Sequence, residues 1–67
     1  MWTLVQRKIV HDSDGFLTEY SWYYEGVQHV FVFGDSDIYR PEDEWFDWEC
    51  ESWDEATEWF DAYEGVE

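Results

Sequence analysis

Residues 16–33 read FLTEYSWYYEGVQHVFVF, which is the strongest structural pattern in the chain. The first nine of them alternate, with an aromatic or β-branched side chain at every second position, as in a half-buried β-strand. Glu25-Gly26 follows, and a glycine can adopt the positive φ that a tight two-residue hairpin requires. Val27 to Phe33 is apolar on both faces near its end, which is typical of a central strand. The stretch therefore predicts two paired antiparallel strands.

A further strand is predicted on the N-terminal side of this pair. Trp2 to His11 is rich in Thr, Val, Leu and Ile, and it is followed by the turn-forming residues Asp12-Ser13-Asp14-Gly15. Calcium-binding loops begin with similar acids, but they continue with oxygen ligands at alternate positions and end in a glutamate. Phe16 breaks that pattern, so we expect a hairpin turn at this cluster.

The chain after Gly34 predicts a loop and a fourth strand. Pro41 lies within the loop, where its missing N–H would interrupt a strand ladder. Trp45 to Glu51 then alternates between apolar and mostly acidic side chains, which indicates a strand with one buried face. The apolar face of this strand consists of Phe46, Trp48 and Cys50.

A helix is predicted directly after the fourth strand. Ser52-Trp53-Asp54-Glu55 has the pattern of a capping box, in which the serine oxygen accepts the N–H of Glu55 and the glutamate binds back to the serine N–H. Gly65 is a typical helix stop signal. The apolar stripe of this helix consists of Ala56, Trp59, Phe60 and Tyr63.

These elements predict a single α+β domain over residues 1–67. Its sheet is an antiparallel four-stranded β-meander with strands near 2–11, 16–24, 27–33 and 45–51. One C-terminal helix near 53–64 packs on one face of the sheet. Large rings bury much apolar area in a short chain, so we expect a core built on Trp22, Trp48, Trp59 and Phe60, with Cys50 as a small buried residue.

Composition excludes several classes of function. The chain has 67 residues, 18 acidic and 3 basic, for a net charge of −15. Nucleic acids and anionic membranes would repel this charge, and a chain this short has little room for an enclosed catalytic pocket. His11 and His29 lie on separate predicted strands without a second metal-ligating neighbour. We therefore expect a non-enzymatic protein with no catalytic residue, metal site or cofactor, and with no direct binding to nucleic acid or membrane.

The acidic residues are concentrated in the second half of the chain. Asp47, Glu49 and Glu51 share one face of the fourth strand, where a spacing of about 6.7 Å corresponds to roughly two phosphate steps of DNA. The helix adds a second row, and the preceding loop adds three more carboxylates. The expected partner-binding residues are Glu42, Asp43, Glu44, Trp45, Asp47, Glu49, Glu51, Asp54, Glu58 and Asp61. Tyr23 and Tyr39 are further candidates for exposed contact residues.

In size, acidity and the aromatic clustering between Trp45 and Glu64, the chain resembles the small phage-encoded DNA-mimic inhibitors of restriction, CRISPR or DNA-repair enzymes. The resemblance implies an inhibitor of anti-CRISPR or anti-restriction type that blocks the basic groove of a defence nuclease or complex. It also implies action in the cytoplasm of an infected bacterial host, which agrees with the single cysteine.

Two other interpretations fit the same composition. An antitoxin or immunity-type module would bind a basic protein unrelated to nucleic acid. A domain adapted to high salt would carry acidic side chains for solubility without a specific ligand. The sequence leaves open whether the protein is a monomer or a homodimer.

Overall fold

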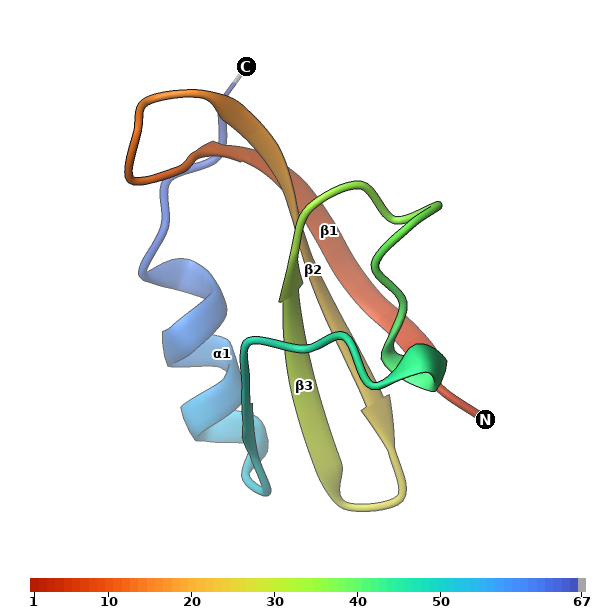
Figure 1. Ribbon diagram of the computed structural model, residues 1–67. Helices are drawn as coiled ribbons and strands as arrows, with labels where there is room; N and C mark the ends of the chain where they lie inside the picture. The colour runs from red at the N-terminus through yellow and green to blue at the C-terminus, as the bar shows by residue number, and fades with distance from the viewer. Residues whose placement is uncertain (67) are drawn as a thin grey trace.

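The computed structural model describes residues 1–66, with four antiparallel strands in one sheet and a single C-terminal helix (Figure 1). The strands are β1 (Thr3–His11), β2 (Leu17–Glu25), β3 (Gln28–Phe33) and β4 (Trp48–Cys50), and they lie in the order β1-β2-β3-β4. A short 3-10 helix, η1 (Pro41–Asp43), lies in the loop between β3 and β4, and the α-helix is α1 (Trp53–Asp61). The predicted α+β meander is confirmed.

Both predicted hairpin turns are present. In the first, Asp12 Oδ1 accepts hydrogen bonds from the N–H groups of Asp14 and Phe16, each at 2.9 Å, and Gly15 has a φ of 85°. Because the turn takes the Phe16 N–H, β2 starts one residue later than predicted. In the second turn Gly26 has a φ of 61°, which a side chain would strain.

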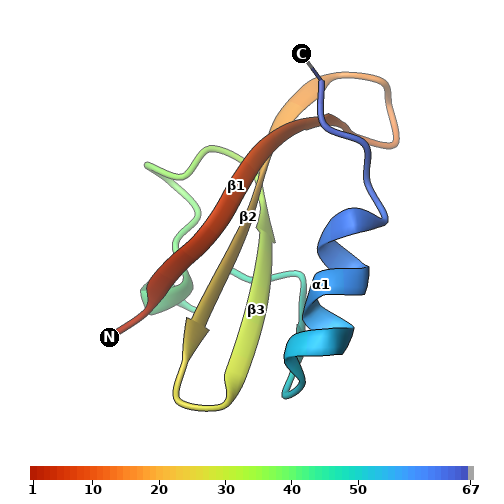
Figure 2. The same ribbon diagram turned by 180° about the vertical axis from the view of Figure 1, so that it is seen from behind.

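The main core lies between the sheet and α1 (Figure 2). Tyr20 and Phe31 from the sheet pack with Ala56 and Phe60 from the helix, and all four are fully buried. The rings of Tyr20 and Phe60 are nearly parallel, with centroids 5.1 Å apart. The remaining members of this core are Val10, Trp22 and Cys50. The predicted burial of Trp22, Phe60 and Cys50 is confirmed, and Trp59 is half-buried against the same cluster.

The loop of residues 34–47 covers the β3 part of the opposite face of the sheet. In both views this loop and α1 lie on opposite sides of the sheet (Figures 1 and 2). Glu19 of β2 holds the start of the loop, because its backbone oxygen accepts the Gly34 N–H at 2.9 Å and its Oε2 accepts the Ser36 N–H at 2.8 Å. Val30 and Val32 are buried on this face. As predicted for a central strand, β3 is therefore buried on both sides.

The fourth strand is shorter than predicted, with residues 48–50 in place of 45–51. Glu44 has a φ of 63°, which turns the chain before the strand begins. Phe46 consequently lines a hollow with Val32 and Tyr39, on the loop side of the sheet, and does not share a face with Trp48. Alternation over 45–47 arises here from a loop that has apolar contacts, so the predicted strand was wrong at its start.

The helix is also shorter than predicted, because it ends at Asp61 rather than near residue 64. Residues 62–66 leave the helix and run to the outer edge of β1, where the Val66 N–H donates to the Ile9 carbonyl at 2.7 Å. Lys8 Nζ of β1 donates to the backbone oxygen of Phe60 in the last turn of the helix and to that of Tyr63 just beyond it. A contact between distant segments therefore sets the end of the helix before Gly65 is reached.

Candidate acidic interaction surface

The solvent-facing side of α1 is the most regular acidic surface of the protein. Ser52 Oγ accepts the Glu55 N–H at 3.3 Å and starts the helix, as predicted. The reciprocal hydrogen bond, from the Ser52 N–H to the Glu55 carboxylate, does not occur among residues 1–66, so that half of the capping-box prediction was wrong. Asp54, Glu58 and Asp61 are exposed at intervals of four and three residues, which places them along one side of the helix over about 10 Å.

These helix carboxylates lack a cationic partner within the described chain. All three basic side chains are occupied elsewhere: Arg7 binds Ser21 and Tyr23, Lys8 binds the end of α1, and Arg40 binds Asp43. The α1 acidic surface, as we name it, consists of six exposed residues that form no ion pair among residues 1–66: Glu51, Asp54, Glu55, Glu58, Asp61 and Glu64. Glu55 and Glu64 were not among the predicted partner-binding residues. The exposure of Glu55 follows from the helical period once the helix is placed, whereas Glu64 lies in the segment that follows the helix.

The predicted row of Asp47, Glu49 and Glu51 does not form a regular strand row. Asp47 Oδ2 accepts the Phe33 N–H at 2.8 Å, so this carboxylate holds the entry to β4 against β3. Glu49 accepts a hydrogen bond from the Gln28 side chain. Since β4 has only three residues, Glu51 lies beyond it and belongs to the surface beside α1.

The predicted loop carboxylates lie on the other side of the molecule. Glu42, Asp43 and Glu44 are on and beside η1, which is separated from α1 by the sheet (Figure 1). Arg40 partly neutralises them, because its Nη2 lies 2.9 Å from Asp43 Oδ2 and its Nε lies 3.9 Å from Glu42 Oε1. The ten predicted partner-binding residues therefore divide between two faces and do not form one surface.

The predicted contact aromatics are only partly available. Trp45 and Tyr39 are exposed on the loop side, where their rings pack edge to face with centroids 5.4 Å apart. Tyr23 is half-buried, and its hydroxyl oxygen accepts a hydrogen bond from Arg7 Nη2 at 2.7 Å. Tyr23 is thus partly committed to the fold.

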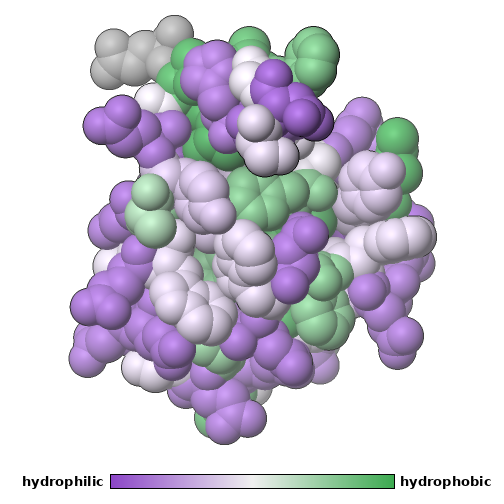
Figure 3. Space-filling view, turned by 60° about the vertical axis from the view of Figure 1, so that its left-hand side comes forward, coloured by the Kyte–Doolittle hydropathy of each residue, from purple (hydrophilic) through white to green (hydrophobic). Residues whose placement is uncertain are grey.

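Trp48 was predicted to be buried, but 36% of its surface is exposed. It stands on β4, which is an edge strand, so its ring has a sheet neighbour on one side only, at Phe33. Trp48, Trp59, Ala62 and Tyr63 line an open hollow of about 370 Å³, which we call the aromatic groove. Figure 3 shows pale aromatic and green apolar side chains meeting among purple polar ones on the side of the molecule that carries α1.

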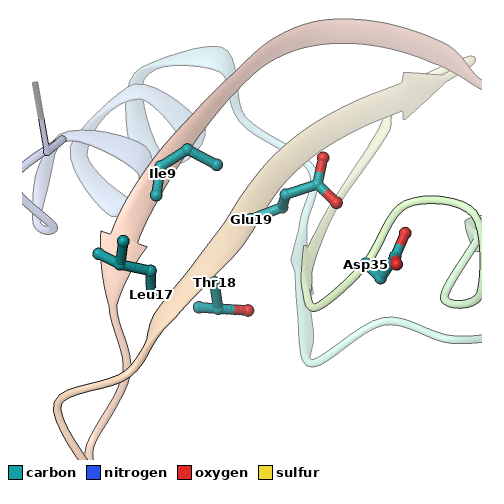
Figure 4. Close-up of a pocket in the computed structure, with 5 residues that line it drawn as sticks. All are labelled: Ile9, Leu17, Thr18, Glu19 and Asp35. Carbon is teal, nitrogen blue, oxygen red and sulfur yellow. The ribbon is translucent and has the colours of Figure 1, made fainter.

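A second hollow lies on the loop side of the β1–β2 hairpin (Figure 4). It is lined by Ile9, Leu17, Thr18, Glu19 and Asp35. Its two carboxylates already serve the fold, since Glu19 binds Ser36 and Asp35 Oδ1 accepts the Asp37 N–H at 2.9 Å. Both carboxylates of this hollow therefore accept hydrogen bonds within the fold.

Burial shifts the pKa values of three side chains. Burial raises the pKa of Tyr20 to about 12, and the Tyr20 hydroxyl donates to the Trp59 carbonyl at 3.0 Å. Burial lowers the pKa of His29, whose Nδ1 accepts the Trp22 indole N–H at 3.1 Å. Burial also raises the pKa of the Cys50 thiol. Each group lies within the packed interior, where its role is structural.

No protein-family model, curated protein or solved structure matches this chain. Among residues 1–66, no cluster of three or more His, Cys, Asp or Glu side chains has an arrangement that could hold a metal ion. Within the same residues, no helix has both the length and the apolar character needed to cross a membrane. The candidate site consists of the α1 acidic surface and the aromatic groove.

Proposed function

We propose that this protein is a non-enzymatic inhibitor that binds the basic nucleic-acid groove of a bacterial defence nuclease or complex, as anti-CRISPR or anti-restriction proteins do. The α1 acidic surface carries the proposal, because its six carboxylates form no ion pair among residues 1–66. Carboxylates without an internal partner are available to the arginine and lysine side chains that grip phosphates.

The helix spacing supports a phosphate-like role. Asp54, Glu58 and Asp61 extend over about 10 Å along α1, and three phosphate steps along one DNA strand cover a similar axial distance at roughly 3.4 Å each. A basic groove would therefore meet acidic groups over an axial length similar to that of three phosphate steps. The protein then competes with nucleic acid by occupying the same arginines and lysines.

Charge and apolar contacts have separate roles in this mechanism. The net charge of −15 accelerates encounter with a basic partner, and individual carboxylate pairs fix the orientation of the complex. The aromatic groove lies next to the acidic surface and supplies apolar contact area, which mainly slows dissociation. Since such defence enzymes work inside the bacterial cell, the protein acts in the cytoplasm of the infected host.

The test is an affinity pulldown of the tagged protein from a lysate of phage-challenged bacteria at physiological salt. Bound proteins are eluted with excess duplex DNA and identified by mass spectrometry, and a mock elution with buffer is the control. Recovery of one nuclease or surveillance complex that DNA releases supports the proposal. A single basic protein that stays bound in excess DNA would indicate an antitoxin or immunity-type function and would overturn nucleic-acid mimicry. Recovery of many unrelated basic proteins that are all released at modest salt would overturn the proposal of a specific partner.

A further inference from the structure

The aromatic groove is an open hollow lined mainly by aromatic side chains. The rings of Trp48 and Tyr63 are inclined by only 16°, with centroids 6.3 Å apart, and Trp59 and Ala62 complete the hollow. Its volume of about 370 Å³ is near the lower end of the range for small-ligand sites, roughly 300–1,000 Å³. The space suits a single side chain rather than a folded element.

A neighbouring hollow extends the groove toward the β1–β2 hairpin. It shares Trp48 and Tyr63 with the groove, and Asp12 contributes to its lining. Glu58 lies one helical turn before Ala62 on the same side of α1. No lysine or arginine among residues 1–66 lines either hollow. The two hollows therefore combine aromatic side chains with carboxylates, and Lys8, whose Nζ donates to the Tyr63 carbonyl, is not among the residues that line them.

This combination selects the chemistry of the occupant. A cation over the face of an aromatic ring is attracted by the ring quadrupole, most strongly over tryptophan. A guanidinium is planar and weakly hydrated, so it stacks on such faces better than an ammonium does. A nucleic-acid base would also stack, but its phosphates would meet the acidic surface.

We propose that the aromatic groove binds an arginine side chain of the partner, stacked against Trp48 and Tyr63, while the α1 acidic surface pairs with the surrounding cations. This inference rests on the proposed function, since the arginine belongs to the same basic partner. It adds a specific anchor to an interaction otherwise based on charge. Arginine is enriched among the residues that dominate binding energy at interfaces.

The experiment is an NMR titration of the whole protein with the N-acetylated amide of Gly-Arg-Gly at physiological salt. The indole N–H signals of Trp48 and Trp59 shift on binding, and those of Trp22 and Trp45 stay in place. Trp48→Leu raises the dissociation constant of the peptide by about 5- to 30-fold. Trp48→Phe keeps an aromatic ring, so its affinity for the peptide falls by less than about 5-fold. This second variant keeps the test valid if the leucine variant fails to fold. The matched control Trp45→Leu removes an exposed indole from the loop side and leaves the affinity within about twofold.

Two control peptides complete the test. Replacement of arginine by neutral citrulline abolishes the indole shifts, and replacement by lysine weakens them. If the citrulline peptide bound as tightly as the arginine peptide, the groove would not be a cation site. Equal losses of affinity from Trp48→Leu and Trp45→Leu would likewise overturn the proposed site. Equal affinity for the lysine peptide would overturn the assignment to arginine. Because the titration uses no target protein, a failed pulldown and a failed titration remain distinguishable.

Discussion

Lys8 Nζ on β1 donates a hydrogen bond to the Phe60 carbonyl at 2.6 Å and lies 4.3 Å from the centre of the Phe60 ring. It also donates to the Tyr63 carbonyl. The last carbonyls of a helix have no intrahelical partner, and the last turn of α1 has no basic residue. One cation from the opposite end of the chain therefore satisfies the C-terminal end of the helix and its dipole.

Lys8→Met is expected to lower the free energy of unfolding by about 2 kcal/mol, because charged hydrogen bonds to the helix end are lost. Urea denaturation followed by far-UV circular dichroism measures this change. Arg40→Met is the matched control, since it also removes one positive charge but breaks only exposed pairs with Glu42 and Asp43. It should cost less than about 1 kcal/mol. Equal losses would mean that net charge, and not the cap, accounts for the effect.

Tyr20 is expected to make the protein less stable at high pH. Its pKa is about 12 in the folded protein against 10.0 in the reference state, so the unfolded chain loses the phenolic proton first. Stability contributed by the protonated phenol is complete below pH 10 and is lost as the pH rises toward 12, by about 2 kcal/mol. Denaturation midpoints measured between pH 9 and 12 should fall more steeply for the parent protein than for Tyr20→Phe. Parallel curves would contradict the assignment to Tyr20.

His29 is expected to make the protein less stable in mild acid. Since burial lowers its pKa, the unfolded state takes up a proton first as the pH falls below 6.5. The free energy of unfolding should therefore fall as the pH drops below 6.5. His29→Gln keeps an acceptor for the Trp22 N–H but does not titrate, and its melting temperature should stay flatter over this range. An equally steep fall in the variant would assign the effect to other groups.

Charge reversal on α1 is expected to weaken partner binding strongly. Glu58→Lys with Asp61→Lys should raise the dissociation constant more than about tenfold, because two carboxylates of the proposed contact become repulsive. Lysines in the last turns of a helix are favoured by its dipole, so the fold is retained. The matched control, Asp37→Lys with Glu44→Lys, makes the same change in net charge on the loop side and should stay within about threefold. Calorimetric titration against the recovered target measures both dissociation constants. Equal losses of affinity in the two double variants would exclude a binding surface localised on α1.

The protein is expected to stay folded at low salt. Its core is aromatic, and its basic side chains support the sheet and the helix from within the fold. Far-UV circular dichroism should show the same spectrum in 10 mM and 1 M NaCl, with a higher melting temperature in the latter because salt screens the self-repulsion. Unfolding in 10 mM NaCl would favour the interpretation of a domain adapted to high salt.

Patterns local in sequence predicted most of the fold. Alternation located β2 and β3, turn residues located both hairpins, and Ser52 located the start of α1. The alternation around Trp45 was misleading, because a loop packed on the sheet can bury alternate residues as a strand does. The left-handed backbone at Glu44 turns the chain before β4 begins, and this conformation does not show in the residue pattern.

The site was less predictable because it depends on contacts between distant segments. Whether Trp48 is buried depends on how far α1 extends over the edge strand, and the helix ends where Lys8 meets it. Asp47 looked like a surface acid, but its hydrogen bond to the Phe33 N–H commits it to the sheet. The sequence showed where carboxylates are concentrated. It did not show which of them accept hydrogen bonds within the fold and which have no internal partner among residues 1–66.

Different residues of α1 pack against the sheet and face the solvent. Ala56 and Phe60 hold α1 to the sheet, whereas the side chains of Glu58 and Asp61 face solvent. Substitutions at such solvent-facing positions usually change stability by less than about 0.5 kcal/mol. The outer face of α1 can therefore change by mutation while the scaffold persists.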